Sequence, residues 1–384
     1  MPGRCSARAD RRAGGVTHRA ACLCAIARDE AAADVREWVC YHLGLGFTHV
    51  ALYDNGSREP LREVLAPLVA RGVVSVTDFP WRDAPQLSAY FHALRLWRGR
   101  VFWLAFFDID EFLVPLTGAA SCADPPLSRL LRPYERFGGV ALHWMMMGSG
   151  GHLRRPPGGT LANYHEALGL DAHVKSIVRP EAVARPLSPH HFAYREGEFA
   201  VNEDGFPVAG ACSYPTARHL RINHYYYKSQ QDFEAKIARG LATPVPGGSR
   251  TLDIFYAGCR LPAVRDTAVR SWRSFGADWA RQAGWDYPGA ATSGEAKTSP
   301  LRLSHCRDMA ALRQLWRQIE ELCRRGVDEA VVLPLRRRLW EQLCRLYAER
   351  GETDTARSAA AFWREQTGCA AGAGGAGGVV AEKA

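Results

Sequence analysis

The feature that most constrains the fold is a run of seven apolar residues, 101–107, followed at once by Asp108-Ile109-Asp110-Glu111. A run this short and this apolar, ended by charge, predicts a strand that is buried on both faces. On an extended segment, Asp108 and Asp110 would point the same way and flank an inward-facing Ile109. Two carboxylates this close together repel each other, so they require a cation or a proton.

The carboxylate pair therefore predicts a metal site. Ligands of open α/β sheets bind at the carboxyl ends of the strands. Mg²⁺ and Mn²⁺ prefer oxygen ligands and complete their shell with phosphate and water. We expect a metal–diphosphate site here, with Asp110 as the first ligand. The alternative is that the acidic residues only form a turn.

Strand and helix patterns alternate in the first part of the chain. Apolar runs at 21–27, 47–53, 73–77 and 101–107 predict four strands, and the residues between them carry apolar side chains at helical spacing. Such alternation indicates βαβ units, so we expect an α/β three-layer sandwich with a mostly parallel sheet. The polar strand ends should meet at one edge of this sheet, where a ligand binds.

Later segments are less regular. The runs 139–144 and 172–178 predict further strands, and Ser229 with Asp232 predicts a capping box that begins a helix. Beyond about residue 300, apolar residues at helical spacing predict a helical appendage. The expected domains are a disordered basic arm (1–20), one α/β domain (21–300), the helical appendage (301–366) and a disordered Gly/Ala tail (367–384).

Several functional classes are disfavoured by what the chain lacks. The net charge is +9, but five Arg against one Asp lie in the basic arm, so charge is a weak argument for nucleic-acid binding. No dinucleotide-binding glycine motif or P-loop motif occurs, and no cysteine pair has zinc-type spacing. No run of 18 apolar residues and no clear signal peptide is present.

An ordered series of motifs resembles glycosyltransferase family 92, over about residues 21–245. The motifs are Cys24-Ala-Ile-Ala-Arg-Asp-Glu30, Glu37-Trp38 with Tyr41-His42, Tyr53-Asp-Asn-Gly-Ser57, Asp108-Ile-Asp-Glu-Phe112, Gly148-Ser-Gly-Gly-His152, Lys175-Ser-Ile-Val-Arg-Pro180, and Ile222-Asn-His-Tyr225 with Lys228-Ser229. The resemblance implies a GT-A fold, a UDP-galactose donor, Mn²⁺ and inversion at the sugar carbon. It makes residues 21–300 a GT-A glycosyltransferase domain.

The resemblance also implies roles for individual residues. The residues assigned to the nucleotide are Ala27, Arg28, Glu30, Asp54, Asn55, Gln86 and Asp108, and those assigned to the metal, Mn²⁺ or Mg²⁺, are Asp108, Asp110 and His224. Asp54 has the alternative role of a helix cap or turn residue, and His224 that of a core histidine. Glu111 would brace the motif from behind or form a salt bridge. Lys175 and Arg179 would neutralise diphosphate or be solvated surface charges.

We therefore predict a metal-dependent inverting glycosyltransferase that moves a hexose, galactose by resemblance, from a UDP-sugar to a glycan acceptor. The hypothesis for the general base is Glu166, which lies between the glycine-rich loop and the strand that carries Lys175. The alternatives are a non-catalytic glycan- or nucleotide-binding protein on the same scaffold and a metal-dependent phosphoryl-transfer enzyme. The resemblance implies the Golgi or secretory pathway, with membrane association only through a missing N-terminus or a partner.

Overall fold

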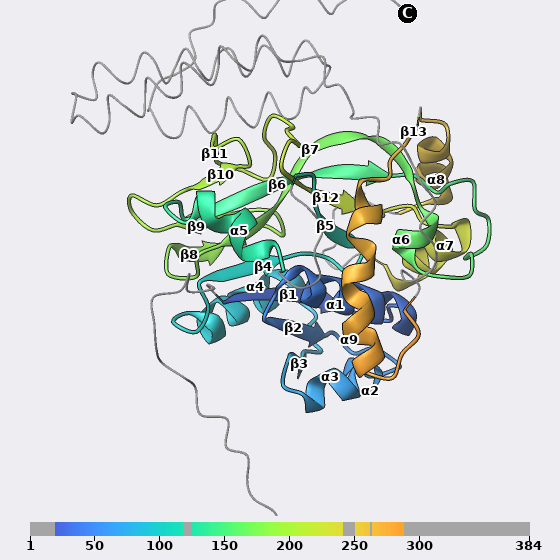
Figure 1. Cartoon of the computed structure of the whole chain (residues 1–384), viewed down its shortest axis with the longest axis horizontal. Helices are drawn as coiled ribbons and strands as arrows, with labels where there is room; N and C mark the ends of the chain where they lie inside the picture. The colour runs from blue at the N-terminus through green and yellow to red at the C-terminus, as the bar shows by residue number, and fades with distance from the viewer. Residues whose placement is uncertain (1–19, 118–124, 241–249, 262, 288–384) are drawn as a thin grey trace, which may run out of the picture.

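A large sheet organises the molecule (Figure 1). The computed structural model describes residues 20–117, 125–240, 250–261 and 263–287. The strands of the large sheet are β1 (Ala21–Ala27), β2 (His49–Asp54), β3 (Val74–Asp78), β4 (Trp103–Phe106), β5 (Glu111–Pro115), β6 (Gly139–Met147), β7 (Glu166–Val178), β10 (Ala200–Asn202), β11 (Pro207–Val208), β12 (Leu220–His224) and β13 (Val264–Arg265). A second, small sheet pairs β8 (Val183–Pro186) with β9 (Phe192–Tyr194).

Helices flank the large sheet. They are α1 (Ala32–Leu45), α2 (Leu61–Val64), α3 (Ala66–Ala70), α4 (Pro85–Trp97), α5 (Leu127–Leu131), α6 (Thr160–Asn163), α7 (Gln230–Arg239), α8 (Leu252–Cys259) and α9 (Ala277–Gln282), with 3-10 turns η1 (Arg132–Tyr134), η2 (Ala268–Ser271) and η3 (Arg273–Gly276). Within the described residues, none of these helices is both long and apolar enough to cross a membrane. The helical appendage (301–366), the tail (367–384) and residues 1–19 of the arm lie outside the described residues.

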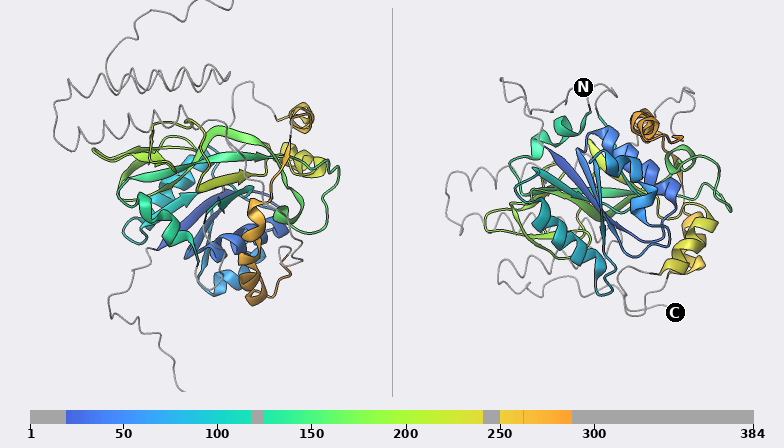
Figure 2. Two further views of the ribbon diagram at one scale, coloured as in Figure 1. Left: turned by 45° about the horizontal axis from the view of Figure 1, so that its top comes forward. Right: turned by 90° about the horizontal axis from the view of Figure 1, so that it is seen from below.

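The first four predicted strands are confirmed, within a few residues at each end. β1 lies between β2 and β4, β3 lies beyond β2, and all three pairings are parallel. Helices α1 and α4 lie on opposite sides of this part of the sheet (Figure 2). The α/β class and the three-layer arrangement that the alternating pattern predicted are therefore confirmed.

Each face of the sheet has its own hydrophobic core. On one face, Tyr90 and Leu94 of α4 pack with Leu104 and Phe106 of β4. On the other face, α1 packs with the strands and with η3 and α9. Gly44 of α1 lies so close to η3 that a β-carbon there would meet the η3 backbone. The small side chain lets the two elements approach each other closely.

Helix α1 also holds β5 in place. The indole Nε1 of Trp38 donates a hydrogen bond to the carbonyl of Glu111 at 2.7 Å, and the Tyr41 hydroxyl donates to the carbonyl of Leu113 at 2.7 Å. Both side chains are fully buried. These two buried hydrogen bonds fix the strand that directly follows the acidic motif, and so they help to position the motif.

Strand directions change in the second half of the sheet. β7 is antiparallel to both β4 and β6, whereas β12 is antiparallel to β5 and parallel to β6. Two strands are longer than we predicted: β6 continues to Met147, and β7 begins at Glu166 rather than at 172. The insertion of β12 between β5 and β6 brings His224 opposite Glu111.

Candidate active site

The carboxyl ends of the parallel strands lie in register at one edge of the sheet. Ala27 pairs with Asp54, and Asp54 pairs with Asp78. β4 is parallel to β1, so the residues that follow Phe106 reach the same edge. The predicted meeting of the strand ends is confirmed, and the acidic motif lies there.

The segment Asp108–Asp110 forms a turn, and our prediction of an extended segment is wrong. The amide of Glu111 donates a hydrogen bond to the carbonyl of Asp108 at 3.0 Å. The physical reason is pairing: β4 pairs with β1 and β7, whereas β5 pairs with β12, so the chain must bend between them. Ile109 is buried as expected, but the two carboxylates have different partners.

Asp108 is bound by a glutamine and a lysine. Gln86 of α4 donates to Oδ1 at 2.7 Å, and Lys175 of β7 donates to Oδ2 at 2.9 Å. The Asp108 side chain is 36% exposed, so it is accessible from solvent. Gln86, which we assigned to the nucleotide, lies in the structure as a partner of this carboxylate.

Lys175 and Glu111 form a fully buried ion pair below Asp108. Their side chains are 0% exposed, and Nζ lies 3.5 Å from Oε2. Burial would lower the pKa of Lys175, but the Asp108 and Glu111 carboxylates raise it above its usual value. Burial raises the pKa of Glu111 well above its usual value, although Lys175 opposes this. Glu111 also accepts the amide of Asp108 at 2.9 Å, so it both braces the motif and forms a salt bridge, and Lys175 is no surface charge.

Asp110 faces a histidine and a second lysine. Its Oδ2 accepts a hydrogen bond from Lys236 of α7 at 2.5 Å and lies 3.6 Å from Nε2 of His224. Burial alone would raise the pKa of Asp110, but the charges of Lys236 and His224 hold it well below its usual value. Asp110 is therefore an ionised carboxylate at neutral pH, surrounded by positive charge.

His224 is buried and carries an unsatisfied nitrogen. Its Nδ1 has no hydrogen-bond partner among the described residues, and neither has the buried Nε1 of Trp144. The two rings are packed 4.3 Å apart. Burial lowers the pKa of His224, although Asp110 opposes this. The other ring nitrogen, Nε2, faces Oδ2 of Asp110, so Nε2 is the nitrogen that a metal ion held by both side chains would bind.

The donors fit a metal ion only in part. Asp110 and His224 supply one oxygen and one nitrogen close together, a donor set that suits Mn²⁺. Asp108 is directed instead toward Gln86 and Lys175. No three His, Cys, Asp or Glu side chains within the described part of the chain are arranged to hold a metal. The residues that fit the predicted ion are therefore Asp110 and His224.

Asp54 and Asn55, which we assigned to the nucleotide, lie at the same edge, but the Asp54 carboxylate is already hydrogen-bonded to backbone amides. Its two carboxylate oxygens accept the amides of Ser57 at 2.8 Å and Leu61 at 2.9 Å, which is the turn and helix-cap role that we gave as its alternative. Asn55 donates to the carbonyls of Phe79 and Trp81. Asp54 and Asn55 thus order the loops around the strand ends.

The first motif follows β1 at this edge. Ala27 ends the strand and is buried, whereas Arg28 is exposed. Glu30 forms an ion pair with Arg239 of α7 at 3.0 Å. Burial raises the pKa of Glu30, Arg239 opposes this, and the negative charge of Asp110 raises it further. Glu30 and Asp110 are therefore neighbours in one electrostatic cluster.

Strand β7 carries two acidic residues that could act in the site. Glu166 is the exposed first residue of the strand, and its carbonyl accepts the amide of Gly148 at 2.7 Å. Asp171 accepts hydrogen bonds from the amide of His173 at 2.8 Å and from its ring at 2.7 Å. Burial would raise the pKa of Asp171, but His173 and then the charge of His224 lower it. The Asp171 carboxyl therefore interacts electrostatically with His224, the predicted metal ligand.

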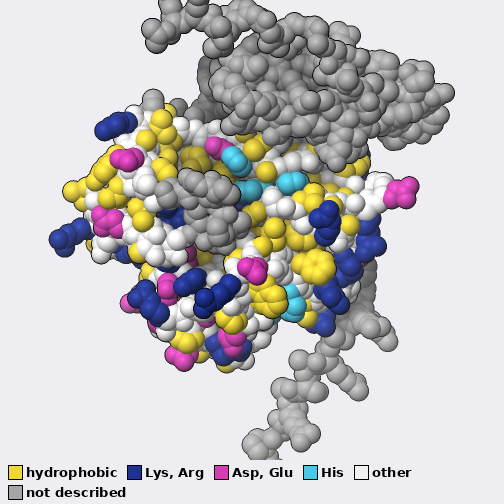
Figure 3. Space-filling view, turned by 180° about the vertical axis from the view of Figure 1, so that it is seen from behind, with side chains coloured by type: hydrophobic (Ala, Val, Ile, Leu, Met, Phe, Trp, Pro, Cys, Tyr) yellow, Lys and Arg dark blue, Asp and Glu magenta, His cyan; other side chains and the backbone are white. Residues whose placement is uncertain are grey.

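Histidine and tryptophan rings form a cluster beside the site. Trp144 stacks on His173 at 5.2 Å and contacts His190 at 5.2 Å. Burial, together with the Lys175 charge, lowers the pKa of His190 to about 3. Figure 3 shows histidine side chains gathered on the rear face of the molecule.

Sequence reasoning missed Lys236, Asp171 and Trp144. The only signal for Lys236 was its place on the helix that begins with the Ser229 capping box, which the structure confirms. A lysine in the last turn of an amphipathic helix is common, so the sequence alone does not indicate that Lys236 faces the site. Asp171 lies one residue before the run in which we expected the strand to begin, and a longer strand would have drawn attention to it.

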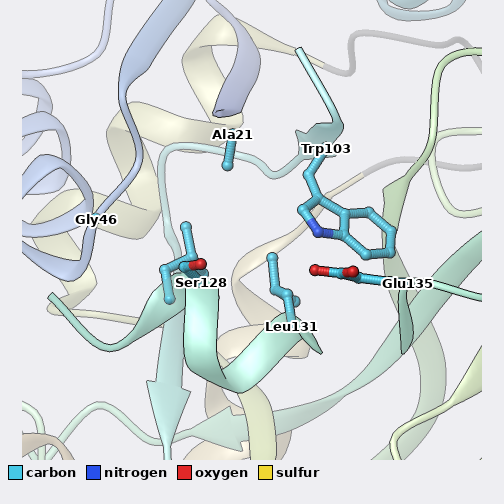
Figure 4. A pocket seen from close by; sticks show the side chains of 7 residues that line it. Ala21, Gly46, Trp103, Ser128, Leu131 and Glu135 are labelled. Carbon is cyan, nitrogen blue, oxygen red and sulfur yellow. The ribbon is translucent and has the colours of Figure 1, made fainter. Parts of the chain in front are cut away.

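A small pocket lies elsewhere in the fold. It is lined by the beginnings of β1 and β4 together with α5, and its lining includes Ala21, Trp103 and Leu131 (Figure 4). Ala21 and Trp103 are the first residues of their strands. The pocket therefore lies at the amino ends of the strands, away from the acidic motif.

Comparison with known proteins finds a family match over the first half of the chain. Residues 19–202 match the sequence pattern described as Glycosyltransferase family 92. A glycosyltransferase family 92 protein of Oryza sativa subsp. japonica is 31% identical over 228 residues, which cover 58% of this chain and 36% of that protein. A family 92 protein of Ricinus communis is 30% identical over 233 residues, 58% of this chain and 38% of that protein. The resemblance that the motifs predicted is confirmed.

Two further matches cover a shorter stretch or have a lower identity. A galactan beta-1,4-galactosyltransferase of Arabidopsis thaliana is 31% identical over 127 residues, 30% of this chain and 23% of that protein. The crystal structure of S. aureus TarS 1-349 in complex with UDP-GlcNAc aligns with a TM-score of 0.29 at 9% identity, covering 90% of this chain and 92% of that one. The chain spans a little over a third of the length of the family 92 relatives above.

Proposed function

We propose, because residues 19–202 match glycosyltransferase family 92, that this chain transfers a hexose from a UDP-sugar to a glycan acceptor. The observation that carries the proposal is the pairing of Asp110 with His224 at the carboxyl edge of the sheet, where α/β folds bind nucleotides. Galactose is the proposed sugar because the Arabidopsis relative is named a galactosyltransferase.

The proposed cofactor is Mn²⁺ or Mg²⁺, held by the carboxylate of Asp110 and the imidazole of His224. The approach of His224 Nε2 to within 3.6 Å of Asp110 Oδ2 and the ionised state of Asp110 support this assignment. When bound, such an ion stabilises negative charge that develops on a departing diphosphate. Asp108, whose carboxylate is one-third exposed, is the proposed contact to the ribose or to the same ion.

The chain's own residues would also hold the rest of the donor. Gln86 and Lys175 orient the Asp108 carboxylate from two sides. Asn55 and Asp54 order the loops at the ends of β2 and β3, where the base of the nucleotide would lie. A rigid, already ordered frame lowers the entropy cost of positioning the donor for attack.

Inverting transfer also needs a general base that takes the proton of the attacking acceptor hydroxyl. Glu166 remains the proposed base, since it is exposed beside the glycine-rich loop at Gly148. Asp171 is the second candidate, because the charge of His224 acts on its carboxyl and only its Oδ1 accepts the His173 hydrogen bonds. Loss of a base slows transfer by about 100-fold or more without removing donor binding.

The first experiment measures Mn²⁺-dependent hydrolysis of a panel of UDP-sugars. Hydrolysis of one donor that Asp110→Ala abolishes supports the transferase. Asp278→Ala is the matched control, because Asp278 is an exposed aspartate of α9 whose partner is Arg281 at 2.8 Å, and it should retain activity. UDP binding by calorimetry without any turnover would favour the non-catalytic alternative, and phosphate release from a phosphomonoester would favour phosphoryl transfer.

The same assay with an acceptor glycan tests the base. Glu166→Gln should lose transfer and keep UDP affinity, whereas full transfer activity in this variant would exclude Glu166. Asp171→Asn tests the second candidate in the same way. Unfolding curves for both variants show whether a loss comes from chemistry or from a damaged fold.

A further inference from the structure

The Lys236 ammonium is bound to Asp110, the carboxylate that we assign to the metal. The ammonium of Lys236 lies 2.5 Å from Oδ2 of Asp110 and 3.1 Å from the carbonyl of Tyr226, and it is 4.2 Å from the centre of the Tyr226 ring. His224 faces the same oxygen from 3.6 Å. Two cations on one carboxylate oxygen repel each other, so Lys236 and a divalent ion exclude one another there.

The two lysines of the acidic motif differ in their freedom to move. Lys175 is 0% exposed and neutralises the fully buried Glu111, so its departure would leave a buried charge without a partner. Lys236 is 15% exposed and belongs to a surface helix, and a flexible four-carbon stem carries its charge. Asp108 thus has a fixed counter-charge, whereas Asp110 has one that can leave.

Helix α7 can release this side chain without losing its own position. Its amino end carries a capping box in which Ser229 and Asp232 satisfy each other's backbone amides. Near its other end, Arg250 donates to the carbonyls of Lys236 and Gly240 at 3.2 and 3.4 Å. Arg239 holds Glu30. These contacts involve backbone or other side chains, so the Lys236 ammonium can move independently of them.

We propose that Lys236 is the resident cation of the Asp110–His224 pair, that a divalent metal displaces it, and that the displaced ammonium then binds the diphosphate of the donor. This inference rests on the proposed function, since it uses the same site. A freed ammonium close to a diphosphate forms a charge-assisted hydrogen bond. Lys236 therefore lowers the affinity for metal alone and raises the affinity for metal and donor together.

The test measures Mn²⁺ binding to the full chain without donor, by calorimetry or by electron paramagnetic resonance. Lys236→Met should bind Mn²⁺ at least about tenfold more tightly than the wild type. In this variant no ammonium competes with Mn²⁺ for Asp110, so the site is free in every molecule. Lys228→Met is the matched control: Lys228 is a nearby lysine whose ammonium is bound to Asp34 at 3.0 Å rather than to Asp110. Because its ammonium does not contact Asp110, this variant should gain clearly less Mn²⁺ affinity than Lys236→Met does.

A second measurement adds UDP. With Mn²⁺ saturating, Lys236→Met should bind UDP about tenfold more weakly than the wild type, since it lacks the charge-assisted hydrogen bond to phosphate. Lys236→Gln serves as a second variant, and thermal unfolding checks that both variants fold. Tighter Mn²⁺ binding with weaker UDP binding in the two variants would support the exchange.

Other outcomes would overturn the proposal. They are an unchanged or weaker Mn²⁺ affinity in both Lys236 variants, an equal gain in Lys228→Met, which would indicate a general effect of charge, and unchanged UDP affinity. The transferase assignment is judged separately, by donor hydrolysis in the wild type and in Asp110→Ala. If the chain hydrolyses its donor but fails these binding tests, the proposed function stands and only the lysine exchange is rejected.

Discussion

The buried ion pair between Lys175 and Glu111 allows a quantitative prediction. In Lys175→Met, the unbranched side chain keeps most of the packing of the lysine stem and removes only the charge. Asp108 loses one partner, but it keeps Gln86 and is one-third exposed, so water can replace the lysine there. Glu111 is 0% exposed, and its Oε1 already lacks a hydrogen-bond partner among the described residues. The cost therefore falls on Glu111.

We expect Lys175→Met to lower the free energy of unfolding by about 3–5 kcal/mol, the usual cost of removing one partner of a buried pair. Urea unfolding of the wild type, Lys175→Met, Glu111→Gln and the double variant measures this. The double variant should be about 1–3 kcal/mol more stable than Lys175→Met, because the glutamine leaves no buried charge. A loss below about 1 kcal/mol, or a double variant no more stable than the single one, would refute the reasoning.

Three further predictions concern stability. Ser229→Ala should cost about 1 kcal/mol in urea unfolding, because the variant lacks the cap of α7; no loss would mean that the cap is redundant. Gly44→Ala should cost about 1–3 kcal/mol despite the better helix propensity of alanine, because its β-carbon would lie 2.1 Å from the carbonyl oxygen of Phe275; a more stable variant would show that α1 and η3 separate easily. The hydrogen bond to Asp171 raises the pKa of His173 to about 10, so its stabilising contribution is complete below its ordinary pKa and is lost as the pH rises through about 10. His173→Gln should lack this loss of thermal stability at alkaline pH, and identical pH profiles for variant and wild type would contradict it.

Much of the fold and part of the site follow from local patterns. The run 21–27 is predicted and observed as β1 with the same bounds, because a short apolar run flanked by polar residues is stable only as a buried strand. The cap at Ser229 depends on residues within one helical turn, and it too was predicted correctly. The ordered motifs predicted the resemblance to glycosyltransferase family 92, and the family match over residues 19–202 confirms that resemblance.

The site itself depends on residues that only the folded chain brings together. Whether Asp108 and Asp110 share a partner was decided by β12, which pairs with β5 and bends the chain between the two carboxylates. Lys175 is as plausible on a surface as in a core when it is seen in sequence. Its burial follows from the antiparallel pairing of β7 with β4 and β6.

The sequence by itself determined the first four strands, the cap at Ser229 and the acidic motif, because these depend on preferences of residues within a few positions of each other. The tertiary structure alone decided which charge faces which. Lys236 reaches Asp110 only because α7 packs at the carboxyl edge of the sheet. A charge takes its partner from whatever the fold places within a few ångströms, and electrostatic attraction in a buried site is strong only over that distance.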